Sequence, residues 1–175
     1  MTSATAGHSF SAMFSLVTYM VLIVGVNWAF AVTPTVSLPG GEVWPPVSLI
    51  VGFIFVVRDF AQQRVEHHVL WAMLFGCAAS WVMASPDLAI ASAAAFAVGE
   101  LADWVLFTVT RKPLSRRILL SSLISTPLDS LVFLGLIGRA APFSFLTMTL
   151  SKLAGAFLVF WLLRRREELA APQGA

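Results

Sequence analysis

The stretch GELADWVLF, residues 99–107, places two carboxylates in the middle of an apolar run. This run extends from Leu88 to Val109, and Glu100 and Asp103 lie one helical turn apart within it. An apolar run of about 20 residues is long enough to cross a bilayer as a helix. A charged Asp at the centre of a bilayer costs on the order of 3 kcal/mol by insertion scales. The stretch therefore predicts a spanning helix whose two acids have a purpose inside the membrane.

The composition of the whole chain agrees with a membrane location. Of its 175 residues, 58% are hydrophobic and 11% are charged, and the mean hydropathy is +0.86. Soluble domains carry about 25% charged residues. The single cysteine, Cys77, excludes an intramolecular disulfide framework. The chain is therefore expected to be an integral membrane protein.

Six apolar stretches organise the chain into one domain, residues 1–175. The second crosses the membrane only if it continues through Arg58 and Asp59, and the short third is expected to use Pro86 and Asp87 as an interfacial turn. The connections are too short to hold a soluble domain. The predicted fold class is all-α integral membrane, with six transmembrane helices at about 10–32, 43–62, 69–84, 88–109, 118–138 and 143–163.

Basic residues predict the orientation of these helices. In a six-span arrangement, the side that carries both termini receives nine basic residues, and the other side receives only Arg139. Positive charge marks the cytoplasmic side, so both termini are expected in the cytoplasm. The two densest basic groups lie at residues 111–117 and 164–166. Because the orientation rule already explains them, they do not indicate a nucleic acid partner. The nine residues are Arg58, Arg64, Arg111, Lys112, Arg116, Arg117, Arg164, Arg165 and Arg166.

Polar residues inside the predicted spans fall on single helix faces. Glu100 and Asp103 share a face with Phe96 and Phe107. The fifth helix has Ser122, Ser125 and Asp129 on one face, and the sixth has Thr149, Lys152 and Ala156. Lipid cannot solvate such groups, so they must face inward, pair with one another or line a cavity. The candidate site residues are Asn27, Arg58, Asp59, Phe96, Glu100, Asp103, Asp129 and Lys152.

Two interpretations of these charges remain open. They could be buried pairs that fix helix packing, with Lys152 on Asp129. The count favours a function, because three central acids meet one lysine. Since Arg58 and Asp59 approximately cancel, two negative charges remain uncompensated. At least one of Glu100 and Asp103 should then hold a proton. Such a surplus suits a proton site, a cation site or a ligand that presents N–H donors.

The aromatic residues near these acids favour a flat ligand. Phe96 and Phe107 share the acidic face and Trp104 is adjacent, although with 14 Phe and 6 Trp in the chain any one of them can simply be packing. A carboxylate accepts two parallel N–H bonds from a guanine-like edge. Lys152 or Asn27 could donate to a ring carbonyl.

Two segments resemble the paired signature of the queuosine-precursor transporter family, also called the vitamin-uptake-transporter-like family. They are AFAVGELADWVLFTVTRK, residues 95–112, and SSLISTPLDSLVFLGLIG, residues 121–138. Asn27 resembles the asparagine of that family's first helix, and Asp59 after FIFVVR the aspartate that ends its second. Lys152 in LSKLAGAF resembles its sixth-helix lysine. The resemblance covers nearly the whole chain.

The resemblance implies import of a 7-deazaguanine base, typically 7-cyano-7-deazaguanine, across the bacterial inner membrane for queuosine biosynthesis. It also implies the six-helix fold of the substrate-binding subunits of energy-coupling-factor transporters. No enzyme activity, metal or other cofactor is expected. The expected partners are the small base and the lipid bilayer, with a second copy in a homodimer as a further candidate. The alternatives are a substrate-binding subunit that needs an ATP-driven partner and a membrane scaffold that transports nothing.

Overall fold

The computed structural model describes residues 3–85 and 88–170, with side chains described for 11–85 and 88–169. This part of the chain contains six α-helices and a two-stranded antiparallel β-hairpin. The all-α class is therefore confirmed, and the turn predicted at Pro86 and Asp87 lies outside the described residues. The helices are α1 (Ser3–Val32), α2 (Ser48–Val65), α3 (Val69–Met83), α4 (Ala89–Val109), α5 (Leu114–Leu136) and α6 (Pro142–Ala170).

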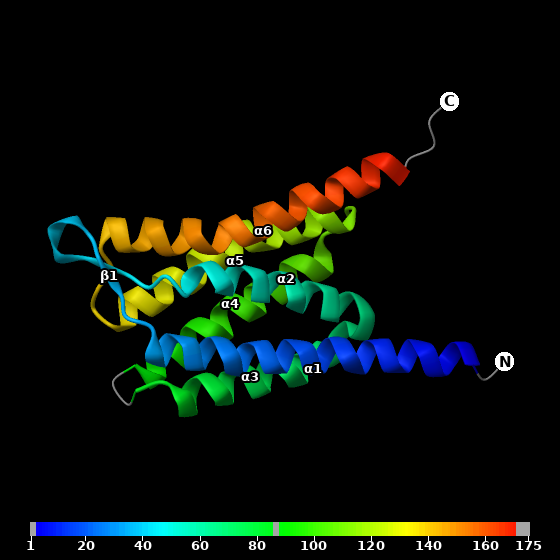
Figure 1. Cartoon of the computed structure of the whole chain (residues 1–175), viewed down its shortest axis with the longest axis horizontal. Coiled ribbons are helices and arrows are strands. Elements are labelled where there is room, and N and C mark those ends of the chain that lie inside the picture. Colours follow the sequence, from blue (N-terminus) through cyan, green and yellow to red (C-terminus); the bar gives the residue numbers. More distant parts are fainter. Residues whose placement is uncertain (1–2, 86–87, 171–175) are drawn as a thin grey trace.

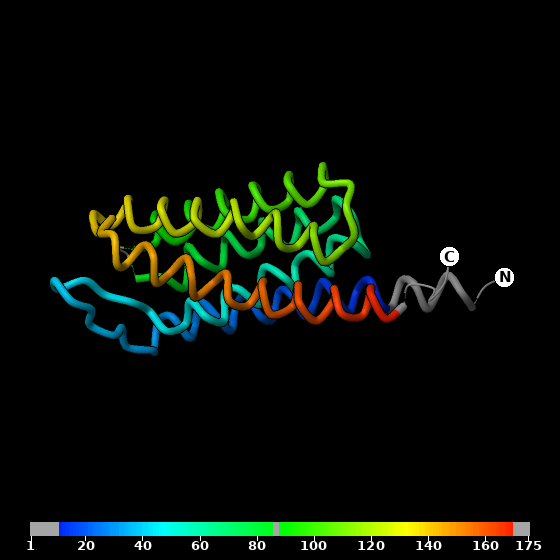
Figure 2. The backbone as a smooth tube through the Cα atoms, turned by 90° about the horizontal axis from the view of Figure 1, so that it is seen from above, coloured from blue at the N-terminus to red at the C-terminus, as the bar shows by residue number. Residues whose placement is uncertain are grey.

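Successive helices run in alternating directions along the bundle (Figures 1 and 2), and their packing contacts close the six helices into a ring. Around the ring the packed neighbours are α1, α2, α6, α5, α4 and α3, and α3 returns to α1. The start of α1 and the end of α6 lie at one end of the bundle, here called the terminal end. The hairpin of β1 (Val36–Ser37) and β2 (Val43–Trp44) lies at the other, here called the hairpin end. Because of this order, α4 lies opposite α2 across the interior.

Four helices are long and apolar enough to cross a membrane. They contribute the segments Ser11–Val32, Ala89–Val109, Leu114–Leu136 and Pro142–Leu169. Helix α2 has 18 residues with three charged side chains among them, and α3 has 15 residues. Helices α2 and α3 are not among the helices that are both long and apolar enough to cross a membrane. The coarse prediction of a membrane protein holds, with four apolar spans of the expected six.

Helix α5 has the polarity expected of a helix surrounded by lipid. Its serines, its threonine and its aspartate are buried against other helices, whereas most of its leucines and one of its two isoleucines are exposed. A soluble bundle has the opposite arrangement, with its apolar stripe inside. The buried residues are Ser121, Ser122, Ser125, Thr126, Asp129 and Ser130, and the exposed ones include Leu120, Leu123, Ile124, Leu128 and Leu131.

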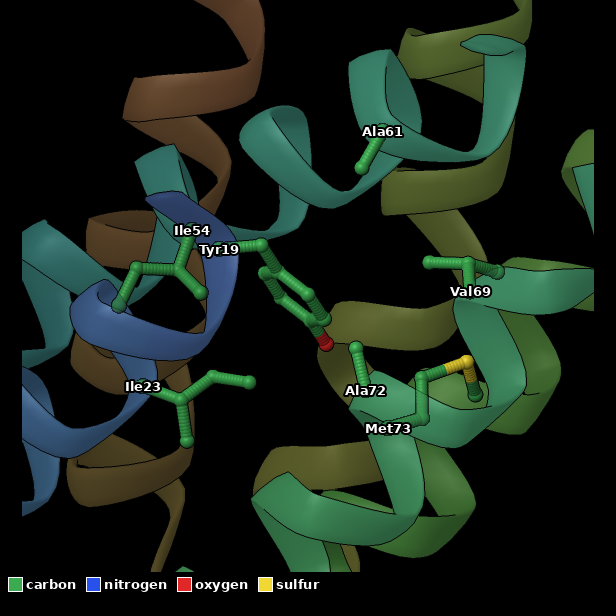
Figure 3. Packing of buried hydrophobic residues seen from close by; sticks show 7 residues of the cluster. All are labelled: Tyr19, Ile23, Ile54, Ala61, Val69, Ala72 and Met73. Atoms are coloured by element: carbon green, nitrogen blue, oxygen red, sulfur yellow. The ribbon is translucent and has the colours of Figure 1, made fainter. Parts of the chain in front are cut away.

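Apolar side chains from α1, α2 and α3 pack together beside this polar interior (Figure 3). Tyr19 and Ile23 of α1 have no exposed surface, and they meet Ile54 and Ala61 of α2. Helix α3 completes the cluster with Val69, Ala72 and Met73. The hydroxyl of Tyr19 is the one polar side-chain group among these seven residues.

Small residues let α6 approach α2 closely. A Cβ added at Gly52 would lie 1.9 Å from the carbonyl oxygen of Lys152, and one added at Gly155 would lie 2.9 Å from the backbone of Gly52. A similar contact joins α4 to α5, where a Cβ on Gly99 would lie 2.7 Å from Cβ of Asp129. These glycines bring the helices that carry Glu100, Asp129 and Lys152 together.

The second predicted span begins later than expected. Val43 and Trp44 belong to strand β2 rather than to a helix, and α2 begins only at Ser48, after two prolines. The Trp44 indole N–H lies 3.1 Å from Ser48 Oγ and 2.9 Å from Ser151 Oγ. The expectation of a helix over 43–47 was wrong because each proline disfavours helical backbone angles at the residue before it, here Trp44 and Pro45.

The fifth predicted span begins earlier than expected, because Leu114 rather than residue 118 starts α5. Pro113 supplies an N-cap at φ −51°. The first turn is further held by α6, since Ser115 donates from its backbone N (3.2 Å) and from Oγ (2.7 Å) to the carboxylate of Glu167. Part of the basic stretch that was assigned to a linker is therefore helical.

Candidate functional site

A cavity of about 910 Å³ lies inside the ring and reaches its hairpin end. Exposed residues at its outer part include Thr35 and Arg139, and its inner part reaches Glu100, Asp129 and Lys152. Most of the other lining residues are apolar, among them Val26, Ile54, Phe55, Leu134 and Met148. Sites for small molecules measure about 300–1,000 Å³ and combine an apolar lining with a few polar groups. This cavity has that size and that lining.

Lys152 and Asp129 form a buried ion pair at the inner part of the cavity. The Lys152 ammonium donates to Asp129 Oδ2 and, at 3.2 Å, to Ser130 Oγ. Both side chains are mostly buried, with 4% and 11% of their surfaces exposed. The pairing of Lys152 with Asp129, which the sequence left as one possibility, is therefore present.

A second charged group gathers around Arg58, in the interior between α2 and α4. Its guanidinium contacts three carboxylates, at 3.3 Å from Asp59, at 3.3 Å from Glu100 and in a close pair with Asp103. Gln62 accepts a further bond from the same guanidinium. The three acids and Arg58 are here called the Arg58 cluster, and each is at most 1% exposed. Arg58 and Asp59 are in contact, but they are not an isolated pair, because the one guanidinium is shared by three acids.

Arg58 therefore lies inside the bundle and not at the end of α2. Arg58 is fully buried and does not belong to either end of the bundle. The other eight basic residues assigned to the terminal side remain there by their place in the chain. Arg139 is exposed at the hairpin end, where it borders the cavity. The charge asymmetry between the two ends persists without Arg58.

Glu100 joins the Arg58 cluster to the cavity. Its Oε2 accepts a bond from Tyr19 Oη at 2.8 Å and lies 3.3 Å from Arg58 Nε. Its Oε1 is buried and has no hydrogen-bond partner within the described parts of the chain. Glu100 lines the cavity, and Asp59, Asp103 and Arg58 do not. The carboxylate of Glu100 thus has one engaged oxygen and one unengaged oxygen.

Tyr19 is a site residue that the sequence interpretation missed. It is the only tyrosine of the chain, and it lies fully buried against Glu100. A signal was present, because Ser15, Tyr19, Ile23 and Asn27 recur every four residues and share one helix face. Extending the face of Asn27 back by two turns would have selected Tyr19.

Five of the eight predicted site residues line the cavity, and three do not. The five are Asn27, Phe96, Glu100, Asp129 and Lys152, and the three are Arg58, Asp59 and Asp103. The Asn27 amide donates to the carbonyl of Ile23 at 2.9 Å, which leaves its side-chain oxygen for another contact. The shared faces predicted for α4, α5 and α6 all turn inward.

Only one of the three aromatic residues considered for a ligand wall borders the cavity. Phe96 does so, whereas Phe107 lies under Arg117, whose guanidinium carbon is 3.8 Å from its ring centroid. Trp104 makes an edge contact with His67, with 5.5 Å between ring centroids. Phe107 and Trp104 therefore pack the terminal end of the bundle.

The buried charges of the described residues do not balance. Four carboxylates, on Asp59, Glu100, Asp103 and Asp129, meet two cations, on Arg58 and Lys152. Burying an unbalanced charge is expensive, and protonation or an added cation removes that expense. The arrangement can therefore hold protons and can offer carboxylate oxygens to an N–H donor.

No protein-family model, no curated protein and no solved structure matches this chain.

Proposed function

We propose that this protein is a multi-pass membrane transporter that imports a 7-deazaguanine base, such as 7-cyano-7-deazaguanine, across the bacterial inner membrane. The observation that carries this proposal is the cavity of about 910 Å³, with Glu100, Asp129 and Lys152 at its inner part. A flat, uncharged base needs such a mostly apolar space with few polar groups. The resemblance of the helix-four and helix-five segments to the queuosine-precursor transporter family supplies the identity of the base.

The geometry favours two separate carboxylates as acceptors for the base. Glu100 Oε2 is already engaged by Tyr19 and Arg58, so Glu100 offers one oxygen and not a parallel pair. Asp129 stands on the neighbouring helix, where it packs against Gly99. A guanine-like edge has adjacent N–H groups. In this arrangement one of them donates to Glu100 on α4 and the other to Asp129 on α5.

Lys152 supplies the complementary donor. An ammonium has three N–H groups, and two of those on Lys152 are used by Asp129 and Ser130. The third is left for the ring carbonyl of the base. Phe96 borders the same cavity and provides an aromatic face for stacking.

All six helices are proposed to cross the membrane, with both termini in the cytoplasm. Helices α2 and α3 are less suited to lipid by length and composition, but Arg58 and Asp59 of α2 are fully buried in the ring. Their charges therefore do not meet lipid. The basic residues at the terminal end support a cytoplasmic location for that end, and the cavity then opens outward.

Transport by the purified chain tests this proposal. Proteoliposomes that contain the wild type alone should take up radiolabelled 7-cyano-7-deazaguanine, and the base should raise the thermal midpoint of the detergent-solubilised protein. Stabilisation without uptake would indicate the binding subunit of an ATP-driven transporter. Neither effect, with purines and vitamins in the same panel also inactive, would indicate a membrane scaffold.

Two substitutions test the site itself. Glu100→Ala and Asp129→Ala should abolish uptake while the protein stays in the membrane, and Glu100→Gln tests the same oxygen with the side-chain shape kept. Glu168→Ala is the matched control, because this carboxylate is 61% exposed near the end of α6. Normal uptake by both alanine variants would contradict the site.

A further inference from the structure

Three members of the Arg58 cluster, namely Arg58, Asp59 and Asp103, lie behind Glu100 and outside the lining of the cavity. The acids of the cluster come from two helices, Asp59 from α2 and Glu100 and Asp103 from α4, and all three touch the one guanidinium. Asp59 Oδ2 and Asp103 Oδ1 are buried and accept no hydrogen bond from an N–H donor among the residues that the structure describes. The cluster therefore has carboxylate oxygens available for a proton.

The charge of the cluster depends on the groups that each neighbouring helix brings to it. Helix α1 contributes the neutral Tyr19, α2 contributes Arg58 and Asp59, and α4 contributes Glu100 and Asp103. Beyond Glu100 lies the Lys152–Asp129 pair of α6 and α5, which is neutral as a pair. Helix α3 brings Cys77, whose thiol donates to the Ala93 carbonyl at 3.8 Å, and His67 lies beyond Trp104.

An ionised cluster has a net charge of two negative units. Arginine stays protonated in proteins, so Arg58 supplies one positive charge and the three carboxylates supply three negative ones. Isolated buried charge is unfavourable by several kcal/mol per ion. Because each member is at most 1% exposed, water cannot compensate this excess. Protons on the carboxylates are the simplest compensation.

We propose that the Arg58 cluster is a proton-binding site that couples uptake of the base to entry of protons, an inference that rests on the proposed function. A base that donates an N–H group binds the ionised form of Glu100 more strongly than the protonated form, so the proton resides on Asp59 or Asp103. Both aspartates share Arg58 with Glu100, and a protonated aspartate holds the guanidinium less strongly. One proton then enters with each base and leaves when the cluster separates toward the terminal end.

The first experiment uses only the wild type. Proteoliposomes carry a pH-sensitive dye inside, the membrane potential is clamped with potassium and valinomycin, and 7-cyano-7-deazaguanine is added outside. Uptake should acidify the interior. An inside-alkaline difference of one pH unit should sustain an internal concentration about tenfold above the external one for one proton per base. Uptake that never exceeds the external concentration, and that leaves the internal pH unchanged, would overturn the coupling.

The second experiment separates coupling from packing. Asp59→Asn and Asp103→Asn preserve size, and neither residue lines the cavity. At least one of them should still exchange labelled for unlabelled base while losing the tenfold accumulation. Glu168→Gln, an exposed carboxylate, is the control and should accumulate the base like the wild type. Accumulation at the wild-type level by both asparagine variants would contradict the inference.

Exchange by the wild type distinguishes the two proposals. Exchange without any response to the pH difference refutes the proton coupling alone and leaves the proposed function standing. No exchange and no uptake by the wild type refutes the proposed function and the coupling together.

Discussion

Substitution of Gly52 by alanine tests the close crossing of α2 and α6. The added methyl carbon would lie 1.9 Å from the Lys152 carbonyl oxygen, whereas ordinary contact begins at 3.4 Å, so the two backbones must separate by 3.4 − 1.9 = 1.5 Å. Overpacking costs about 1–3 kcal/mol, occasionally more. The upper value of about 3 kcal/mol applies, because a helix backbone yields less readily than the end of a side chain.

Gly135→Ala in α5 is the matched control. Nothing lies within 4 Å of a Cβ at that position, so only the helix propensity of alanine acts there, and it stabilises by up to about 1 kcal/mol. Both variants gain this propensity term, and the difference between them isolates the clash. At about 2–4 °C per kcal/mol for a chain of this size, Gly52→Ala should melt roughly 6–12 °C below Gly135→Ala.

The assay is thermal unfolding of both purified variants in the same detergent. Base binding should also weaken in Gly52→Ala, because the displaced residue, Lys152, borders the cavity. A midpoint for Gly52→Ala within about 2 °C of the Gly135→Ala midpoint would refute the close crossing.

Three further predictions concern the ion pair, the buried tyrosine and the topology. Lys152→Met and Asp129→Asn should each destabilise the protein by about 3–5 kcal/mol because each leaves a buried charge unpaired, and the double variant should recover most of that loss. Additive losses in this double-mutant cycle would argue against coupling. Tyr19→Phe removes the hydroxyl that donates at 2.8 Å to the cavity carboxylate, and it should lower the free energy of unfolding by about 1.5–3 kcal/mol. An unchanged thermal midpoint would contradict that role. A cysteine at the exposed Ala140 should react with an impermeant maleimide in intact cells, whereas one at the exposed Gln63 should react only after permeabilisation. The reverse pattern would overturn the orientation.

Periodicity predicted the helices more accurately than their ends. The faces of α4, α5 and α6 turn inward as predicted, because side chains three, four and seven residues apart project from one side of any α-helix. The boundaries near residues 43 and 118 were misplaced because apolar residues do not stop at a helix end. Backbone chemistry decided those ends, through Pro45 and Pro46 before α2 and Pro113 before α5.

The sequence by itself determined that this is an all-α membrane protein with ionisable groups inside its helices. Length, apolarity and spacing are local properties of the chain, so Glu100, Asp103, Asp129 and Lys152 could be assigned to inward faces from the sequence. Ion pairing is different, because it depends on which helices become neighbours. In the ring, α1 and α2 are not packed neighbours of α4, but their side chains meet those of α4 in the interior. Only this tertiary arrangement gives Arg58 three carboxylate partners, brings Tyr19 to Glu100 and leaves Asp59 and Asp103 outside the cavity. The physical reason is that an ionic contact reaches only a few ångströms, and residues as far apart in sequence as Tyr19 and Glu100 meet only when packing brings their helices together.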